Sequence, residues 1–194
     1  MLKLTKVAAN AGVGETFDVP KFVGSQSVPL KPVLTTIDID LYGPVYAAYL
    51  AIHYFQNNSP PTGGRFVVTS SAAGLYGVVN HPTYCAAKFG CVGLIRSLGL
   101  DKSLKKHGIT FNAICPGVVE TGIAPQVVYK LLKETMPDVL TPMSTIMKGF
   151  NTILESDMTG EVLECSGELV VQRPQHDPLT DRLDRLSSLM ERSR

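Results

Sequence analysis

Apolar residues along this chain gather alternately in short runs of strand length and in longer runs with helical spacing. Four short runs are expected to form strands, the last of them being the final strand: residues 2–10, 65–70, 109–114 and 160–165. Residues 35–56 and 81–108 are expected to be helices. Lys105, Lys106 and His107 before Gly108 predict the end of the second helix. This alternation favours an α/β fold, a parallel sheet with helices on both faces.

The length of the chain favours one main domain. With 194 residues and 44% hydrophobic content, it can bury a single core, which we place at residues 1–174. A C-terminal tail, residues 175–194, has Leu183, Leu186 and Met190 at helical spacing. The tail is therefore predicted to be a short amphipathic helix that packs on the body or on a partner subunit.

Charge and composition exclude several classes of function. A net charge of +1 gives no electrostatic footprint for nucleic acid. The most apolar run, residues 41–55, is too short to span a membrane and is interpreted as a buried or interface helix. The N-terminus lacks the apolar segment of a signal peptide. Four cysteines without C-x-x-C spacing predict neither a metal site nor a disulfide, so a cytoplasmic protein is expected.

Tyr84 and Lys88 carry the candidate chemistry. Their i, i+4 spacing at the start of the second helix places phenol and ammonium on one face, where Lys88 can stabilise a Tyr84 phenolate. Ser71 follows an apolar strand thirteen residues before Tyr84 and can donate a hydrogen bond to the same substrate oxygen. Ser70 competes for this role, and the spacing of thirteen favours Ser71. Together these groups can move a proton on and off an alcohol or a ketone.

Three ordered motifs give the pair a context. ANAG (9–12), the Ser71, Tyr84 and Lys88 spacing, and NAICPGVVETGI (112–123) resemble the short-chain dehydrogenase/reductase family. Within it they are most similar to the 15-hydroxyprostaglandin dehydrogenase type and to fungal alcohol dehydrogenases. The resemblance covers about residues 4–167. It implies a Rossmann-like fold and a reaction with NAD or NADP in which Tyr84 is the acid/base, Lys88 assists it and Ser71 orients the substrate.

The same resemblance implies the residues that hold the cofactor. Asn10 would brace the central strand near the adenosine side, and Thr121 and Val119 would bond the nicotinamide carboxamide. The full implied set lies after two strands and on the second helix: Asn10, Ala11, Gly12, Tyr84, Lys88, Pro116, Gly117, Val119 and Thr121.

The glycine-rich turn T-G-x-x-x-G-x-G that opens the family is absent from this sequence, so the Rossmann-like fold is expected to be N-terminally truncated. Losing about three charge-assisted hydrogen bonds to the pyrophosphate costs roughly 5–9 kcal/mol. A dissociation constant no tighter than about 0.1–1 mM is therefore expected for NADH or NADPH. The first predicted strand becomes an open edge. One explanation is that Lys3, Thr5 and Lys6 make this strand polar enough to remain unpaired at the edge of the sheet. The other is that the sequence is an incomplete gene product or an alternative start.

Other positions concern proton transfer near Lys88 and the binding of the substrate. Asp40 stands where the family usually has an asparagine that holds a water in its proton relay. An aspartate can hold such a water too, or its added charge can perturb Lys88, and the sequence leaves both open. Residues 123–150 match the family's substrate lid, where Met136, Met143 and Met147 suit an apolar substrate or plain core packing. Tyr76 and His81 are interpreted either as substrate-facing or as surface residues.

The resemblance also implies an assembly. The family pairs two long helices across a two-fold axis, here residues 41–55 and 84–104. Ala47, Ala48, Gly90 and Gly93 would permit close approach, so a homodimer or homotetramer is expected.

Three hypotheses about function follow. The motifs favour an NAD(P)-dependent oxidoreductase that interconverts a secondary alcohol and a ketone on a small apolar molecule. The missing glycines leave room for two others. One is a cofactor-independent isomerase, dehydratase or cyclase that uses Tyr84 and Lys88 for acid/base work alone, and the other is a non-catalytic remnant.

Overall fold

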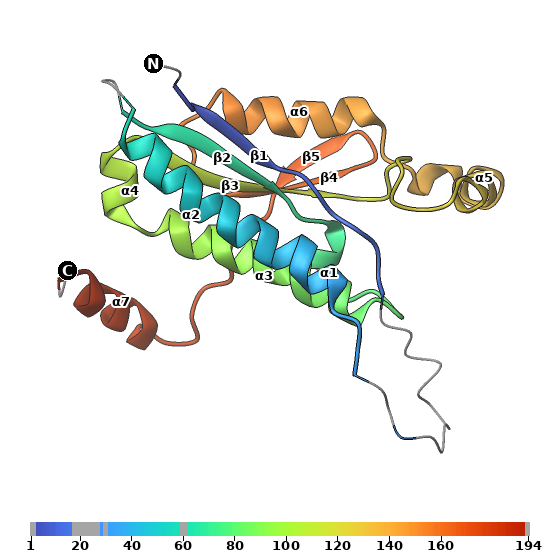
Figure 1. Ribbon diagram of the computed structural model, residues 1–194, viewed down its shortest axis with the longest axis horizontal. Helices are drawn as coiled ribbons and strands as arrows, with labels where there is room; N and C mark the ends of the chain where they lie inside the picture. Colours follow the sequence, from blue (N-terminus) through green and yellow to red (C-terminus); the bar gives the residue numbers. More distant parts are fainter. Residues whose placement is uncertain (1–2, 17–27, 29–30, 59–61, 193–194) are drawn as a thin grey trace.

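A five-stranded sheet lies at the centre of the protein (Figure 1), in a computed structural model that describes residues 3–16, 28, 31–58 and 62–192. The strand order is β1-β2-β3-β4-β5. The strands are β1 (Lys6–Ala9), β2 (Gly64–Thr69), β3 (Ile109–Pro116), β4 (Val162–Ser166) and β5 (Leu169–Gln172). β1 to β4 pair in parallel, which confirms the α/β class.

β5 corrects the expectation that the sheet ends with the fourth strand. It pairs with β4 in antiparallel fashion through a tight turn at Gly167, whose φ of 55° lies in the region that glycine adopts without steric cost. The strand is only four residues long and mostly exposed, so its sequence carries little hydrophobic alternation. The sheet is therefore mixed.

The helices form two layers around this sheet. α2 and α3 cover one face and α6 covers the other, while α5 projects beyond the end of the sheet (Figure 1). The helical elements are α1 (Thr35–Ile37), η2 (Asp38–Tyr42), α2 (Gly43–Gln56), η3 (Ala72–Gly74), α3 (Pro82–Gly99), α4 (Lys102–Lys106), α5 (Gln126–Thr135), η4 (Pro137–Val139), α6 (Met143–Leu154) and α7 (Arg182–Arg192).

The second long helix is divided, contrary to the expectation of one helix over residues 81–108. α3 ends at Gly99, and Asp101 begins α4 by accepting hydrogen bonds from the backbone N–H groups of Ser103 and Leu104. Aspartate is a favoured N-cap, so the break has a local cause. The basic residues expected to end the catalytic helix instead end α4.

Each face of the sheet has its own hydrophobic core. Phe66 and Phe111 pack at a centroid separation of 5.1 Å on the side of α2 and α3, together with Phe55. On the side of α6, Ile114 and Ile153 are among the residues that form the second cluster. β3 is buried along almost its whole length, as a central parallel strand must be.

β1 lies at one end of the strand order, so the expected open edge is present in the part of the chain that the structure describes. The predicted tail helix is also present, as α7. It stands apart from the layered body in Figure 1, and Leu183, Leu186 and Met190 are exposed, so the expected packing on the body is not seen. Among the described helices, none is long and apolar enough to cross a membrane.

Candidate functional site

The candidate site lies where β1, β2 and β3 end and α3 begins. Parallel strands present their carboxyl ends at one edge of the sheet, which is where open α/β sheets bind their ligands. Pro82 opens α3 in the first turn, where its missing N–H costs no hydrogen bond. This places Tyr84 in that first turn and Lys88 one turn later on the same face.

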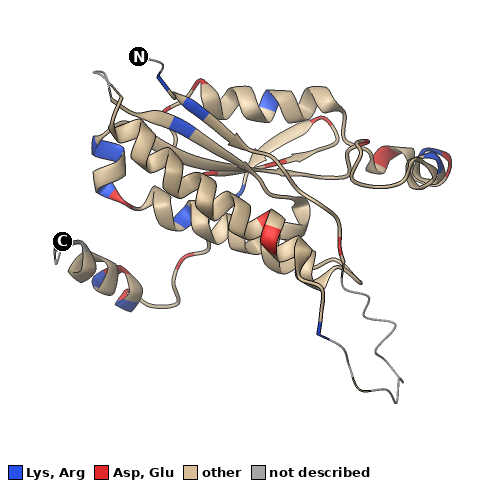
Figure 2. Cartoon of the chain, in the orientation of Figure 1, with Lys and Arg blue, Asp and Glu red and all other residues tan. Residues whose placement is uncertain are grey.

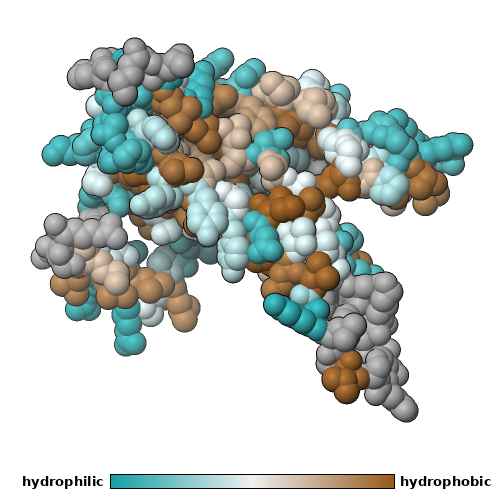
Figure 3. Space-filling model, in the orientation of Figure 1, coloured by the Kyte–Doolittle hydropathy of each residue, from teal (hydrophilic) through white to brown (hydrophobic). Residues whose placement is uncertain are grey.

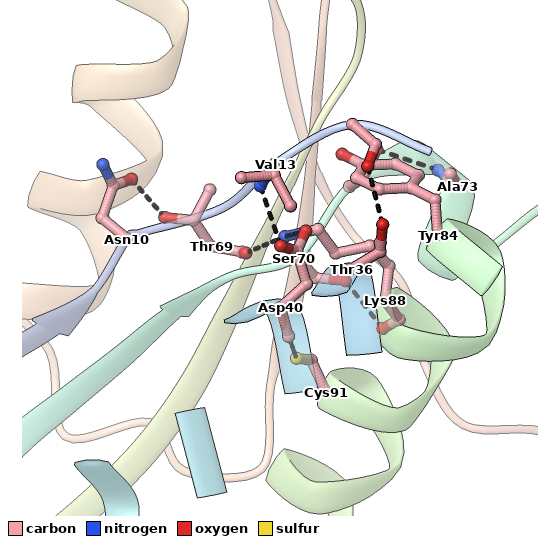
Figure 4. Close-up of polar contacts among 12 residues, drawn as sticks. Asn10, Val13, Thr36, Asp40, Thr69, Ser70, Ala73, Tyr84, Lys88 and Cys91 are labelled. Atoms are coloured by element: carbon pink, nitrogen blue, oxygen red, sulfur yellow. Dashed lines mark hydrogen bonds and ion pairs between the residues drawn. The ribbon is translucent and has the colours of Figure 1, made fainter. Parts of the chain in front are cut away.

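Lys88 is buried, with 3% of its surface exposed, in spite of its charge. Its Nζ lies 5.4 Å from the centre of the Tyr84 ring. Nζ donates a hydrogen bond to the Thr69 carbonyl at 3.1 Å and lies 3.0 Å from Asp40 Oδ2 (Figure 4). The ammonium therefore has one neutral and one charged partner, and it stands beside the phenol as the spacing predicted.

Asp40 is fully buried within η2, a single turn of π-helix. Its Oδ1 accepts a hydrogen bond from the backbone N–H of Val13 at 2.8 Å, and its Oδ2 faces Lys88. In place of the water-holding asparagine that the resemblance implied, the site therefore contains a buried ion pair. Single π-turns occur frequently at functional sites.

The two serines after β2 have different environments. Ser70 is buried, and its hydroxyl donates to the Lys88 carbonyl at 2.9 Å. Ser71 is half-buried and caps η3 by accepting the N–H of Ala73 at 3.1 Å. An accepted bond leaves the Ser71 hydroxyl proton available for a ligand. This arrangement favours Ser71, as the spacing did, and its catalytic role stays a prediction.

The segment after β1 braces the site. Asn10 Oδ1 accepts a hydrogen bond from the Thr69 hydroxyl at 2.7 Å, which ties the ends of β1 and β2 together. A Cβ at Gly12 would lie 3.3 Å from both Asp40 Oδ2 and Lys88 Nζ. Glycine thus lets the backbone pass close to the ion pair. Asn10 and Ala11 are exposed at this edge.

The segment after β3 reaches the same edge. Pro116 is the last residue of β3, and the Gly117 N–H donates to the Cys165 carbonyl at 2.8 Å. Val119 is half-buried, and Thr121 is exposed, where its hydroxyl accepts the N–H of Ile123 at 3.3 Å. The structure thus carries these predicted residues to the carboxyl edge of the sheet, while their contacts with a cofactor stay predictions.

Glu15 is a residue of the site that the sequence did not single out. Its carboxylate accepts the backbone N–H of Tyr84 at 2.9 Å and the hydroxyl of Thr83. It therefore acts as an N-terminal cap of α3 from sixty-nine residues away in sequence. No local pattern signals such a cap, because capping boxes are recognised only between near neighbours.

Tyr76 and His81 differ in their contacts. The Tyr76 hydroxyl donates to Glu164 at 2.9 Å, and this bond to a carboxylate raises the pKa of Tyr76 above its usual range. His81 Nδ1 lies 2.8 Å from the Val79 carbonyl, and its ring centre is 6.4 Å from that of Tyr84. His81 is thus close to the acid/base candidate, whereas the Tyr76 hydroxyl is held by β4.

The cysteines are free thiols, and no group of three metal-binding side chains occurs among the residues described. Burial raises the pKa of Cys91 and Cys165 to about 11 and that of Cys115 to about 12. These thiols are therefore protonated near neutral pH, and Cys91 donates to the Asp40 carbonyl at 3.1 Å.

Comparison with known proteins places this site in a family. The family model described as short chain dehydrogenase matches residues 1–131. The short-chain dehydrogenase/reductase prx6 of Penicillium rubens is 35% identical over 176 residues, which are 87% of this chain and 57% of that protein. Human 15-hydroxyprostaglandin dehydrogenase [NAD(+)] is 41% identical over 88 residues, 45% of this chain and 33% of that enzyme. The chain spans about half the length of the fungal relatives it matches.

A solved structure shares the fold. A short-chain type dehydrogenase/reductase from Mycobacterium marinum superposes with a TM-score of 0.67 at 20% identity, over 85% of this chain and 64% of that one. The family match covers well over half of the chain and includes β1 to β3, Ser71, Tyr84 and Lys88. The chain therefore belongs to the short-chain dehydrogenase/reductase family.

Proposed function

We propose that the chain interconverts a secondary alcohol and a ketone on a small apolar molecule, with NAD or NADP as cofactor. The observation that carries the proposal is the placement of Tyr84 and Lys88, with Nζ 5.4 Å from the ring centre at the carboxyl edge of the sheet. Relatives named as dehydrogenases support the same class of reaction.

Ser71, Tyr84 and Lys88 have different roles in alcohol oxidation. Ser71 donates a hydrogen bond to the substrate oxygen and orients it. Tyr84, as a phenolate, takes the hydroxyl proton, while Lys88 stabilises the negative charge that the phenolate carries. The chemistry that a bound nicotinamide would supply is acceptance of the hydride from the carbinol carbon. In ketone reduction Tyr84 returns the proton to the carbonyl oxygen.

The residues at the carboxyl edge of the sheet suit part of a nicotinamide cofactor. Asn10, Ala11 and Thr121 are exposed at the edge where Lys88 and Tyr84 meet. Lys88 Nζ has two partners, the Thr69 carbonyl and Asp40, for three N–H donors, so its third donor would be available to a bound cofactor. The proposed cofactor surface is completed by five more residues: Gly12, Tyr84, Pro116, Gly117 and Val119. The sequence contains no glycine-rich turn for the pyrophosphate, so weak binding to the chain alone is part of the proposal.

The substrate side of the proposal rests on apolar residues around α5 and α6. Met136, Met143 and Met147 are exposed, as are Val127 and Leu131 of α5. Figure 3 shows brown apolar side chains beside teal hydrophilic ones on the projecting end that contains α5. A flexible thioether surface adapts to greasy ligands, which supports an apolar substrate.

A homodimer or homotetramer, and a cytoplasmic location, complete the proposal. α2 has no charged residue (Figure 2), and it exposes Tyr46, Tyr49 and Leu50. An exposed aromatic surface of this kind suits a protein interface. Gly90, by contrast, faces Leu41 of its own chain, so it serves internal packing. The free cysteines are consistent with a reducing compartment.

The proposal is tested by following nicotinamide oxidation or reduction with a panel of apolar secondary alcohols and ketones. Turnover that requires the nucleotide and is lost in Tyr84→Phe is the expected result. Tyr54→Phe is the matched control, because this tyrosine is 54% exposed in the last turn of α2, which lies beside the start of β2 and not at the carboxyl edge of the sheet. Turnover without nucleotide would instead indicate the cofactor-independent enzyme, and neither nucleotide binding nor turnover would indicate the remnant.

A further inference from the structure

The carboxylate of Asp40 has two oxygens and faces two donors. Oδ1 accepts the Val13 N–H at 2.8 Å and Oδ2 lies 3.0 Å from the Lys88 ammonium. The side chains of Lys88 and Asp40 are 4% and 0% exposed, so water contributes little to either charge. A lone ammonium at this depth would favour its neutral form. The carboxylate is the group that opposes this tendency.

Among the ionisable groups near Lys88, Asp40 is the carboxylate that faces the ammonium, and Tyr84 is the group whose charge changes during the proposed reaction. Tyr84 and Cys91 stand on α3, one turn before and nearly one turn after Lys88. The Cys91 thiol is buried, and its pKa is raised to about 11, so it is uncharged at neutral pH. Glu15 is bound to the Tyr84 backbone N–H and to Thr83 at the start of α3. β2 contributes only the neutral Thr69 carbonyl.

We propose that Asp40 is a positioning residue whose carboxylate keeps Lys88 charged and holds it against Tyr84. The catalytic consequence rests on the function proposed above, whereas the effect on Lys88 does not. An asparagine at this position would not replace the carboxylate, because an amide has one oxygen for two donors. If that oxygen faces Val13, the amide NH₂ group meets the ammonium. If it faces Lys88, the Val13 N–H loses its acceptor.

The size of the effect follows from the distance. The attraction of two unit charges 3.0 Å apart corresponds to about 1 pH unit at the dielectric constant of water and to about 4 pH units at an effective protein value of about 20. In Asp40→Asn, the Lys88 amine should thus release its proton at least about 1 pH unit lower than in the parent protein.

The test is an NMR titration of protein with ¹³C-labelled lysine. The Lys88 Cε resonance is identified by its absence in Lys88→Arg, and its midpoint is compared in the parent and in Asp40→Asn. Asp157→Asn is the matched control, since this carboxylate pairs with Arg65 but is 97% exposed, and it should leave the Lys88 midpoint unchanged. An equal midpoint in parent and Asp40→Asn overturns the proposal.

Two further measurements test the role of Asp40. If Asp40→Asn does not fold, the parent alone decides, because loss of the ammonium signal within the pH range of turnover contradicts a charge held by Asp40. If the parent turns over substrate, kcat/KM of Asp40→Asn should fall on the alkaline side, where the parent is still active. A parent without nucleotide-dependent turnover would refute the proposed reaction and leave the titration to decide the role of Asp40.

Discussion

Replacing Lys88 by methionine tests the buried ion pair through the stability of the fold. Methionine is unbranched like lysine, one heavy atom shorter and uncharged, so Asp40 stays buried with an uncompensated carboxylate. Its Oδ2 loses the partner at 3.0 Å, and only the bond from the Val13 N–H to Oδ1 remains.

The expected loss is about 3–5 kcal/mol of the free energy of unfolding, because removing one member of a buried pair leaves a charge that neither water nor protein solvates. A domain of this size has roughly 5–15 kcal/mol in total, so this loss is a large share. Urea unfolding followed by circular dichroism measures this loss of free energy. An equal denaturant slope m in variant and parent shows that the unfolded state is the same in both.

Lys133→Met is the matched control. It makes the same substitution in the Lys133–Glu120 pair, whose N···O distance of 2.7 Å is shorter but whose side chains are 52% and 40% exposed. Exposed pairs contribute about 0–1 kcal/mol. The double variant Lys88→Met with Asp40→Leu should recover part of the loss, since an apolar pair has no charge to desolvate, although the Val13 N–H then loses its acceptor. A loss below about 1 kcal/mol in Lys88→Met would refute the reasoning.

Three further predictions concern catalysis, packing and pH. Tyr84→Phe should abolish turnover with an unchanged circular dichroism spectrum, because it removes only the hydroxyl group; undiminished turnover would contradict the acid/base role. Gly99→Ala should cost about 1–3 kcal/mol in urea unfolding, since its Cβ would overlap the backbone of Gly160, whereas Gly93→Ala, with nothing within 4 Å of its Cβ, should be neutral or stabilise by up to about 1 kcal/mol. Equal effects of the two substitutions would count against this packing. The three buried thiols have pKa values raised to about 11 for Cys91 and Cys165 and about 12 for Cys115, so their contribution to stability is complete below about pH 8.5 and is lost as the pH rises through about 11 to 12. In native alkylation at mild pH, half-buried Cys85 should react first, and equal rates for all four cysteines would contradict the burial.

The sequence alone predicted the class of the fold and the proximity of Tyr84 and Lys88 at the candidate site. Tyr84 and Lys88 are one helical turn apart, so any helix through them puts phenol and ammonium on one face. The strand-length runs and the helical runs between them were enough to predict the α/β class and the four parallel strands, because hydrophobic periodicity is a local property. The spacing of thirteen residues to Tyr84 favoured Ser71, whose role stays a prediction, and the hydroxyl of its neighbour Ser70 donates to the Lys88 carbonyl.

Only the tertiary structure decided what surrounds Lys88. Asp40 is forty-eight positions away, and its charge alone did not reveal whether it held a water or paired directly with the ammonium; the fold placed it 3.0 Å away and buried both side chains. Glu15 capped α3 across a comparable separation. β5 follows a turn at Gly167, and the break after Gly99 is followed by the Asp101 cap of α4. Neither feature is visible in a pattern of hydrophobic positions. Local periodicity determines elements and the residues within one turn of each other, whereas the electrostatic environment of a buried charge depends on contacts between segments far apart in the chain.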